Sequence, residues 1–452
     1  MDLTPLSLFF SDPVLRAPTI GCMLMCLTAG LVGAIVFLRK QSLIGEALSH
    51  ASYPGVVLGV LFTGVFFSPE SDDTLLSFFI LIGASFTALL GLWLIHLLEK
   101  KLKVPSDAAL CFILATFFGI GLTIASEVQF SFTTLYKKVQ VYLYGQAATM
   151  TDIHILIYGV LACVVICMVF FLYKELQIIT FDRSYAKSLG IRTKPIDTVL
   201  FVLVVLAVII GIRSVGVVLM SAMLIAPPVA ARQFTNRLSM LFILSALFGV
   251  ISGFLGNYSS VEITHYMSIY YPGARIVLPT GPMIVLVASF ICLLALLLAP
   301  KRGLLLRVYR VILFRYQCMG ENILKDIWRR GSDVKVHFNE ILKNQDVSKL
   351  YLKFILWRMV ANGWIEKNGA GVYSLTTDGS HRAAKIVRLH RLWEVYLVDY
   401  LEVGVERVHR NAEEMEHIIT PDLERELTFL LNDPKRDPHQ QPIPPQEETR
   451  AF

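Results

Sequence analysis

Charged side chains are scarce over the first 300 of the 452 residues, which hold 17 Lys or Arg and 14 Asp or Glu. The remaining 152 residues hold 24 and 21. The first part is therefore about 10% charged and the second about 30%, against roughly 25% in ordinary soluble domains. With a mean hydropathy of +0.61, this division excludes a single soluble enzyme and a disordered chain. It indicates a membrane-embedded part up to Pro300, followed by a soluble part.

The chain also lacks paired cysteines, a large excess of one charge and a nucleotide-binding loop. Seven Cys are present without a CxxC pair, which excludes a secreted disulfide scaffold. The net charge of +6 divides equally between the two parts, so neither has the excess typical of a generic polyanion binder. No GxxxxGKS or GxxxxGKT motif occurs, so the chain has no nucleotide-binding loop of this type. No basic n-region precedes the first apolar run, and we expect no cleavable signal peptide.

Long apolar runs are what the first part does contain. Because backbone polar groups must be paired internally in hydrocarbon, runs of about 20 apolar residues predict spanning helices. We place nine, at 19–38, 43–67, 75–98, 108–126, 154–172, 196–212, 215–231, 238–256 and 280–299. The odd count depends on the break at Arg213 and Ser214. It puts the two ends of the membrane part on opposite sides.

The distribution of basic residues among the loops predicts the orientation. One set of alternate loops holds twelve Lys or Arg and the other holds five. Because cytoplasmic loops carry the excess of basic residues, the soluble part is expected in the cytoplasm and the spans in the inner membrane. The basic residues after Pro300 are expected to contact anionic lipid headgroups.

The soluble part has the outline of a winged helix-turn-helix followed by a helical domain. Helices are expected at 320–330, 335–344 and 348–362, then a β-hairpin over 364–375 with Asn368-Gly369 at its turn. Further helices are expected at 379–402, 407–417 and after Pro421, with a loose Pro-rich tail from Pro434. The predicted domains are a membrane-spanning part at 1–300, a basic linker at 301–320, the winged helix at 321–378 and the helical domain at 379–452.

Two groups of potential metal ligands recur at helical spacing. Glu46 and His50 lie four residues apart within the second predicted span, where titratable side chains are usually functional; a structural pair near the membrane interface is the alternative. In the soluble part, His390 and Glu394 share one helix face. The second set comprises His409, Glu413, Glu416 and His417. Such N and O ligands suit Mn(II) or Fe(II), and Zn(II) also fits; surface helices with charged faces are the alternative.

The membrane part resembles the ABC-3 family of metal-importer permeases. The similarity is carried by Gly45 to Gly55, which contains Gly-Glu-Ala-Leu-Ser-His, and by Pro105 to Ala109. It continues through Phe181-Asp182 with Ala186 and Gly190, Ala226 to Ala230, and Leu278 to Pro282. The resemblance implies that Glu46 and His50 are ligands on the metal pathway, with Glu where Asp is commoner.

This resemblance also implies partners. The loop containing Asp182, Ala186 and Gly190 corresponds to the short helix that docks onto a separate ABC ATPase subunit. A second permease subunit, identical or different, and an external solute-binding protein that delivers the ion are also expected.

The soluble part resembles the diphtheria-toxin-repressor family of metal-dependent regulators. The similarity runs from Arg388 to Leu392 with Glu394, through Val408-His409, to Asn432-Asp433-Pro434 and Pro442 to Pro444. It implies one ligand set of His390, Glu394 and His409. A second set would contain Glu413, Glu416 and His417, and its remaining ligand falls near Asn322.

The same resemblance implies DNA binding. The segment 348–362 corresponds to the recognition helix, which makes Ser348, Lys349, Tyr351 and Lys353 candidates for contact with operator DNA. Phe354 stands where a polar base-reading residue is expected.

As a whole, the chain is similar to chlamydial permease–repressor fusion proteins. It is expected to be the permease subunit of an importer for Fe(II), Mn(II) or Zn(II), carrying a metal-dependent repressor domain that proteolysis within 301–320 could release. Alternatively, the soluble part inhibits transport directly without binding DNA, or it is degenerate.

Overall fold

The computed structural model describes residues 5–66, 73–271, 277–331, 334–345, 347–369 and 371–446. The chain divides into two compact units, Met1–Leu306 and Arg307–Phe452. We refer to them as the N-terminal unit and the C-terminal unit and describe each by itself.

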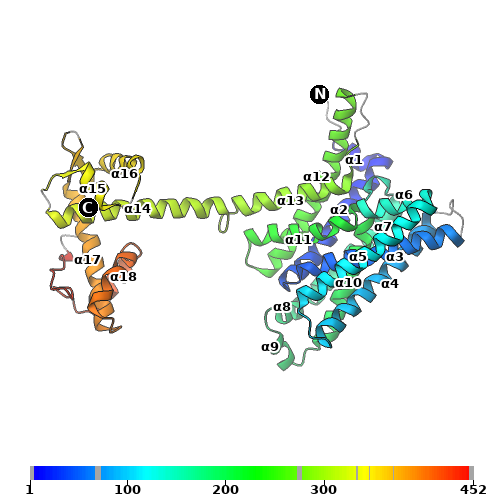
Figure 1. The fold of residues 1–452 in the computed structure, drawn as a ribbon, viewed down its shortest axis with the longest axis horizontal. Helices are drawn as coiled ribbons and strands as arrows, with labels where there is room; N and C mark the ends of the chain where they lie inside the picture. The colour runs from blue at the N-terminus through cyan, green and yellow to red at the C-terminus, as the bar shows by residue number, and fades with distance from the viewer. Residues whose placement is uncertain are drawn as a thin grey trace. The chain divides into compact units, whose positions relative to one another are not determined.

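The N-terminal unit is a bundle of apolar helices (Figure 1). Over the described residues, nine helices are long and apolar enough to cross a membrane, which confirms the predicted spans. They are α2 (Pro13–Leu38), α3 (Ser42–Phe66), α4 (Asp73–Lys100), α5 (Ser106–Ser131), α7 (Asp152–Phe171), α10 (Thr193–Val215), α11 (Val217–Phe234), α12 (Leu238–Tyr270) and α13 (Thr280–Leu298).

Two boundaries depend on polar or glycine residues. Gly216 has φ +96° and separates α10 from α11, so the stretch 196–231 is two helices, as the odd span count requires. The helix α12 continues well past residue 256, where the predicted span ended. Its polar residues Asn257 and Ser260 are buried and satisfied, because Asn257 donates to Thr19 Oγ1 at 2.8 Å and Ser260 donates to the carbonyl of Leu278 at 2.7 Å.

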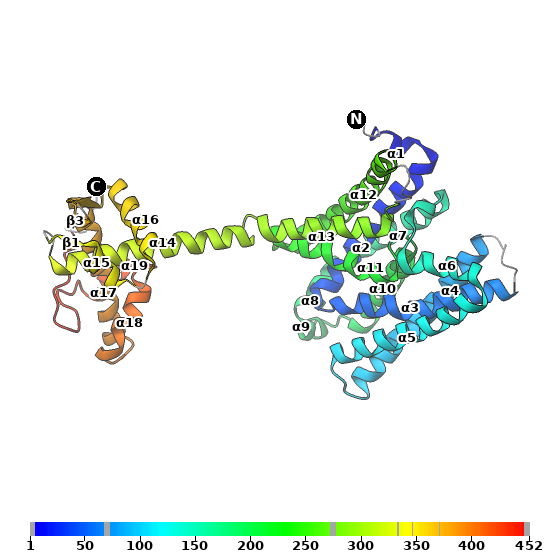
Figure 2. The ribbon, with the colours of Figure 1, turned by 45° about the horizontal axis from the view of Figure 1, so that its top comes forward.

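Shorter helices that the sequence analysis did not predict complete the unit. They are α1 (Leu8–Ser11), α6 (Thr133–Tyr144), η1 (Ala147–Thr149) and α8 (Tyr173–Phe181). A further short helix, α9 (Arg183–Ser188), lies where the family resemblance placed one. The helix α1 lies beside α12 (Figure 2). Phe10 of α1 stacks on Phe254 of α12, with ring centroids 5.8 Å apart. Their sequences are too short or too polar for a span, so hydropathy alone does not reveal them.

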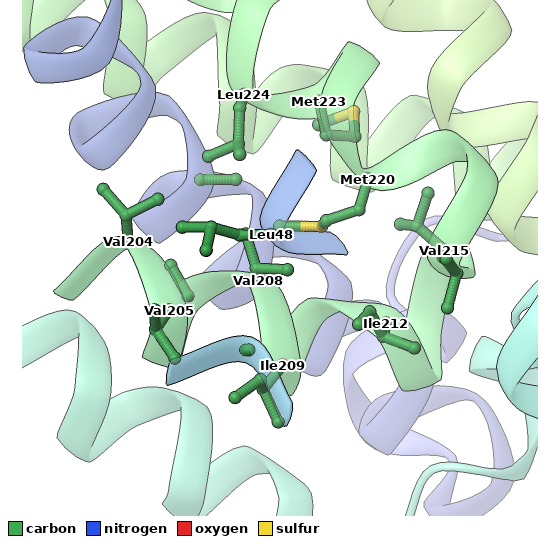
Figure 3. Packing of buried hydrophobic residues seen from close by; sticks show 14 of the residues in the cluster. Leu48, Val204, Val205, Val208, Ile209, Ile212, Val215, Met220, Met223 and Leu224 are labelled. Carbon is green, nitrogen blue, oxygen red and sulfur yellow. The ribbon is translucent and has the colours of Figure 1, made fainter. Parts of the chain in front are cut away.

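The helix α3 is packed on several sides. At the crossing with α4, a Cβ on Gly55 would lie 2.0 Å from the carbonyl oxygen of Gly83, so the two backbones meet directly. On another side, Leu48 lies among Val204 and Val208 of α10 and Met220 of α11 (Figure 3). This close packing holds α3 in one position.

The C-terminal unit begins within one long helix, α14 (Leu304–Arg330). We expected a helix at 320–330 and a linker before it, but residues 304–319 contain no Gly or Pro and continue the helix. After α14 come β1 (Val336–His337), α15 (Phe338–Asn344), α16 (Lys349–Ala361), β2 (Ile365–Lys367) and β3 (Val372–Leu375). The antiparallel sheet has the order β1-β3-β2, which confirms the winged-helix outline. The short strand β1 replaces the start of the helix expected at 335–344.

The remainder of this unit is helical. It contains α17 (Thr377–Asp399), α18 (Val405–Met415) and α19 (Pro421–Leu430). The unit has its own core, formed by Ile323 of α14, Leu352 and Met359 of α16 and Ile365 of β2, all buried. Smaller buried clusters hold α17 against α19 and against the chain after residue 434. The C-terminal unit is therefore held together by contacts of its own.

Candidate metal centres

In the N-terminal unit, α3 presents Glu46 and His50 one turn apart. His50 is buried, its Nδ1 has no hydrogen-bond partner, and its ring meets Phe118 of α5 edge-on with centroids 4.5 Å apart. Glu46 is half-buried. Ser49, between them, donates to the carbonyl of Val217 at 2.6 Å and fixes the face of α3. A buried imidazole nitrogen without a partner fits a cation ligand.

The predicted coupling residues form one short structure. Asp182 caps α9 by accepting from the backbone N–H groups of Ser184 and Tyr185, both at 2.9 Å. Ala186 is fully buried. Gly190 has φ +76°, a conformation that favours glycine. Within the described residues, these features define a compact, exposed helical turn.

An ion-pair bridge that the sequence analysis missed connects α9 to the start of α3. Asp197 of α10 pairs with Arg183 of α9 through one oxygen and with Arg39 through the other, the latter at 2.9 Å. Arg39 lies just before Ser42, the first residue of α3. Arg183 and Asp197 are 14 residues apart, but Arg39 is distant from both in sequence, so spacing alone could not link the three.

In the C-terminal unit, the structure brings His390 and Glu394 of α17 together with His409 of α18. His390 Nε2 lies 3.2 Å from Glu394 Oε1 and 3.0 Å from His409 Nδ1, and His409 Nδ1 lies 3.0 Å from Glu394 Oε1. One ligand atom from each residue falls within 4.8 Å of the others. We call these residues the first ligand group. Two imidazole nitrogens and a carboxylate oxygen are suitable ligands for a first-row divalent ion.

Hydrogen bonds within the first ligand group shift the pKa values of its members against the effect of burial. Burial raises the pKa of Glu394, but hydrogen bonds from His390 and His409 outweigh it and bring the pKa down to about 2. Burial lowers the pKa of His390, but hydrogen bonds to Glu394 and Glu416 outweigh it and raise the pKa. A buried carboxylate that stays ionised beside imidazoles fits a divalent cation.

The chain after Pro434 forms one wall of this site. Asp437 accepts from the backbone N–H groups of His439 and Gln441 at 2.9 and 2.8 Å, and His439 Nδ1 lies 3.7 Å from Glu394 Oε2. Asp437 and His439 also form a ligand-like group with Glu394. An open cavity of about 620 Å³ is lined by residues of both groups. The sequence analysis missed these two residues, although their Asp-x-His spacing after Pro434 was a usable signal.

The prediction of a loose Pro-rich tail from Pro434 is wrong for the described residues up to 446, because this segment packs on α17. Arg436 and Pro442 form a β-bridge, and Ile443 is buried against Leu392 and Val395. The guanidinium of Arg388, itself buried, donates to the carbonyl of Pro444 at 2.8 Å. Proline-rich composition predicted disorder, but one apolar side chain and one buried arginine hold the segment.

The second predicted ligand set has a different arrangement. Glu416 accepts from Lys325 Nζ of α14 at 2.5 Å through one oxygen and contacts His390 Nδ1 through the other. His417 Nδ1 lies 2.5 Å from Glu321, so Glu321 reaches the cluster in place of Asn322. Glu413 lies 3.6 Å from His409 Nε2 and 4.0 Å from Lys325 Nζ. We call Lys325, Glu413, Glu416 and His417 the lysine cluster; the sequence analysis did not identify Lys325.

The predicted DNA-contact residues lie at the start of α16. Ser348 is the N-cap and accepts from the backbone N–H of Tyr351 at 3.4 Å. Tyr351 is half-buried against the core, whereas Lys349 and Lys353 are exposed. Leu350, Phe354 and Trp357 are also exposed on this helix.

Comparison with known proteins supports both units. A model of the ABC 3 transport family matches residues 11–299, and a model described as iron dependent repressor, metal binding and dimerisation domain matches residues 376–445. A probable metal transport system membrane protein of Chlamydia trachomatis serovar D is 36% identical over 446 residues, covering 97% of this chain and 98% of that protein. The manganese transport system membrane protein MntC of Bacillus subtilis is 33% identical over 389 residues, covering 85% and 84%.

The fold of the membrane helices also has a solved counterpart. The structure of PsaBC from Streptococcus pneumoniae in complex with Fab is similar with a TM-score of 0.53 and 25% identity, over 66% of this chain and 96% of that chain. The relatives are named as membrane proteins of metal transport systems. Such permease subunits are not enzymes, and ATP hydrolysis in ABC systems belongs to a separate subunit. The chain therefore belongs to the ABC 3 transport family, as an integral-membrane metal permease with a C-terminal iron-dependent repressor domain.

Proposed function

We propose that this chain carries a divalent metal ion across the inner membrane and that its C-terminal unit senses the same ion by binding it in the cytoplasm. Fe(II) and Mn(II) are favoured, and Zn(II) also suits the ligands. The observation that carries the proposal is the first ligand group, in which His390 and Glu394 are buried and lie against His409, in the same chain as a permease. Metal analysis of residues 307–452, together with uptake competition among the three ions, tests it.

For transport, we propose Glu46 and His50 as ligands on the ion pathway. The unpartnered Nδ1 of buried His50 supports this role. In cells that contain the complete importer, Glu46→Ala and His50→Ala should each abolish uptake of radioactive manganese or iron without loss of assembled protein. His265→Ala, which removes an exposed histidine of α12, is the matched control. Normal uptake by either pathway variant would refute the assignment.

The partners follow from the same function. We propose that α9 docks onto the ABC ATPase, that a second permease subunit, identical or different, completes the pathway, and that a solute-binding protein delivers the ion from outside. The exposed turn capped by Asp182 and ended by Gly190 supports the docking role. Exposed Lys301 and Arg302 are suited to anionic lipid headgroups.

For the output of the sensor, we propose that the metal-bound C-terminal unit represses the importer's genes by binding operator DNA. Lys349 and Lys353 are exposed at the start of α16 and suit contact with phosphates. Because Ser348 caps the helix and Tyr351 packs on the core, these two have structural roles as well. A metal-dependent gel shift of the importer's promoter, lost in the Lys349→Ala, Lys353→Ala double variant, is the expected result.

A second candidate output is direct inhibition of transport. It is favoured by the exposed apolar side chains of Leu350, Phe354 and Trp357 on α16, which suit a protein surface better than a DNA groove. The two outputs are distinguished by experiment. Metal-sensitive ATPase activity of the assembled transporter, with no promoter shift, supports inhibition.

If the repressor acts on DNA, release from the membrane is expected. The hypothesis of cleavage within 301–320 is narrowed by α14, because helical backbone from Leu304 onward is a poor protease substrate. Lys301 and Arg302 lie before the helix and are exposed, so we propose cleavage there. An immunoblot of native cells that shows full-length protein alone would count against release.

A further inference from the structure

Lys325 is a charged residue in an unusual place. It lies on α14, yet only 5% of its surface is exposed. Its Nζ is 2.5 Å from Glu416 Oε1 and 4.0 Å from Glu413 Oε1. An ammonium group leaves water only when other groups compensate its charge. The carboxylates of Glu416 and Glu413 supply that compensation.

The surroundings of Lys325 Nζ are those of a cation site. Glu416 is buried, and it is the C-cap of α18, where the helix dipole also favours positive charge. The next residue, His417, has Nε2 3.6 Å from Glu416 Oε1, and this nitrogen is buried without a hydrogen-bond partner. Two carboxylates therefore face one ammonium group, and an imidazole lies beside one of these carboxylates. Without the ammonium, the same side chains would be suitable ligands for a divalent ion.

A divalent ion cannot occupy this cluster together with Lys325. At about 4 Å, like charges in a partly buried site repel strongly. Lys325 is also covalently attached to a helix whose Ile323 and Ile327 are buried in the core. Because the ammonium is tethered beside these carboxylates, its effective local concentration is high, and a free ion competes poorly with it.

Glu416 connects this ammonium to the first ligand group. One oxygen contacts Lys325 Nζ, and the other contacts His390 Nδ1. In the neutral tautomer that donates from Nδ1 to Glu416, Nε2 of His390 has a lone pair for an ion held between Glu394 and His409. Lys325 thereby helps to hold His390 in the orientation that binds an ion.

We propose that the Lys325 ammonium is a built-in cation that fills the cluster of Glu413, Glu416 and His417, so that the C-terminal unit binds one divalent ion per chain. This inference rests on the proposed function, in which His390, Glu394 and His409 hold the sensed ion. The cluster of Glu413, Glu416 and His417 then acts as a support for His390 and does not respond to metal concentration itself. The sensor would respond to metal through a single site.

The experiment counts ions. Residues 307–452, which have a core of their own, are dialysed against excess Mn(II), and bound metal is measured by mass spectrometry. Wild type is expected to bind one ion per chain, and Lys325→Met two. Lys343→Met, which removes an exposed lysine of α15, is expected to bind one. The same difference between Lys325→Met and wild type is measured on the full chain in detergent.

Two further variants keep the outcomes separate. His417→Ala in the wild-type background should leave the count at one, whereas in the Lys325→Met background it should return the count from two to one. Two ions in wild type, or loss of an ion in the single variant His417→Ala, would overturn the inference even if Lys325→Met does not fold. A folded Lys325→Met that binds one ion would overturn it as well. If instead wild type binds none and His390→Ala changes nothing, the proposed sensor function fails, while the gain of an ion in Lys325→Met still tests the built-in cation.

Discussion

Glu394 Oε1 lies 3.0 Å from His409 Nδ1, although the two residues belong to different helices, α17 and α18. Glu394 is buried and His409 is half-exposed, so the pair joins the interior of the C-terminal unit to an open cavity. An ion can therefore reach the site from solvent and still contact a buried carboxylate.

Glu394→Gln and His409→Ala should each lower the affinity of residues 307–452 for Mn(II) by at least about 10-fold, since even loss of an outer-shell partner costs about 10–100-fold. Isothermal titration calorimetry measures the change. His337→Ala removes an exposed histidine of β1 and should leave the affinity unaltered. Equal affinities for all four proteins would show that the ion binds elsewhere.

His439→Ala should lower the same affinity less than His409→Ala does. His439 Nδ1 is 3.7 Å from Glu394 Oε2, and its side chain is 42% exposed, so it can approach an ion bound at Glu394 without being part of the first ligand group. We expect a loss of about 3- to 10-fold, or about 0.7–1.4 kcal/mol. Calorimetry under the same conditions checks it, and an effect as large as that of His409→Ala would make His439 a full ligand.

Ile443→Ala should destabilise the C-terminal unit by roughly 2–4 kcal/mol, because a buried Ile leaves a cavity when truncated. Ile443 is 6% exposed and packs against Leu392 and Val395. Urea unfolding of residues 307–452, followed by circular dichroism, measures the change. Ile418→Ala, at an exposed position, should stay within about 0.5 kcal/mol of wild type. A negligible effect at Ile443 would mean that the segment after Pro434 is loose after all.

Asp197→Asn should uncouple α9 from α3 in the assembled transporter. The substitution removes the carboxylate shared by Arg183 and Arg39 and leaves two cations facing each other. We expect metal uptake to fall about 5-fold or more, since coupling free energies between sites are typically about 1–3 kcal/mol. Uptake and co-purification of the ATPase are measured together, with Lys137→Ala at an exposed position of α6 as the control. Unchanged uptake would remove Asp197 from the coupling path.

Gly55→Ala should impair folding of the N-terminal unit, because the added Cβ would lie 2.0 Å from the carbonyl oxygen of Gly83. Gly119→Ala on α5 is the matched control, since no atom lies within 4 Å of its added Cβ. The yield of monodisperse protein in detergent should fall for the first variant and not for the second. Comparable yields would indicate that α3 and α4 can move apart at little cost in folding free energy.

Much of the fold was predictable because it depends on local composition. Long apolar runs cannot leave their backbone groups unpaired in hydrocarbon, so they identified the spans. Their ends were less predictable: α12 extends to Tyr270 because Asn257 and Ser260 find partners on distant segments. Helical spacing likewise placed Glu46 with His50, and His390 with Glu394, on common helix faces.

The candidate sites were predictable only in part. Spacing and family resemblance placed His390, Glu394 and His409 in one set, and the structure brings them together. His439 was overlooked despite its Asp-x-His spacing, because proline-rich composition argued for a loose segment. Neither spacing nor resemblance indicated Lys325, since its neighbour Glu416 is 91 residues away.

The sequence by itself determined the division into an apolar and a polar unit, the spans, and the helix faces that carry potential ligands. These depend on composition and on a period of about 3.6 residues, which are local properties. Only the tertiary structure decided that Lys325 lies where a second ion was expected and that the segment after Pro434 forms a wall of the site. Those outcomes depend on which distant side chains compensate a buried charge, and burial is a property of the folded chain.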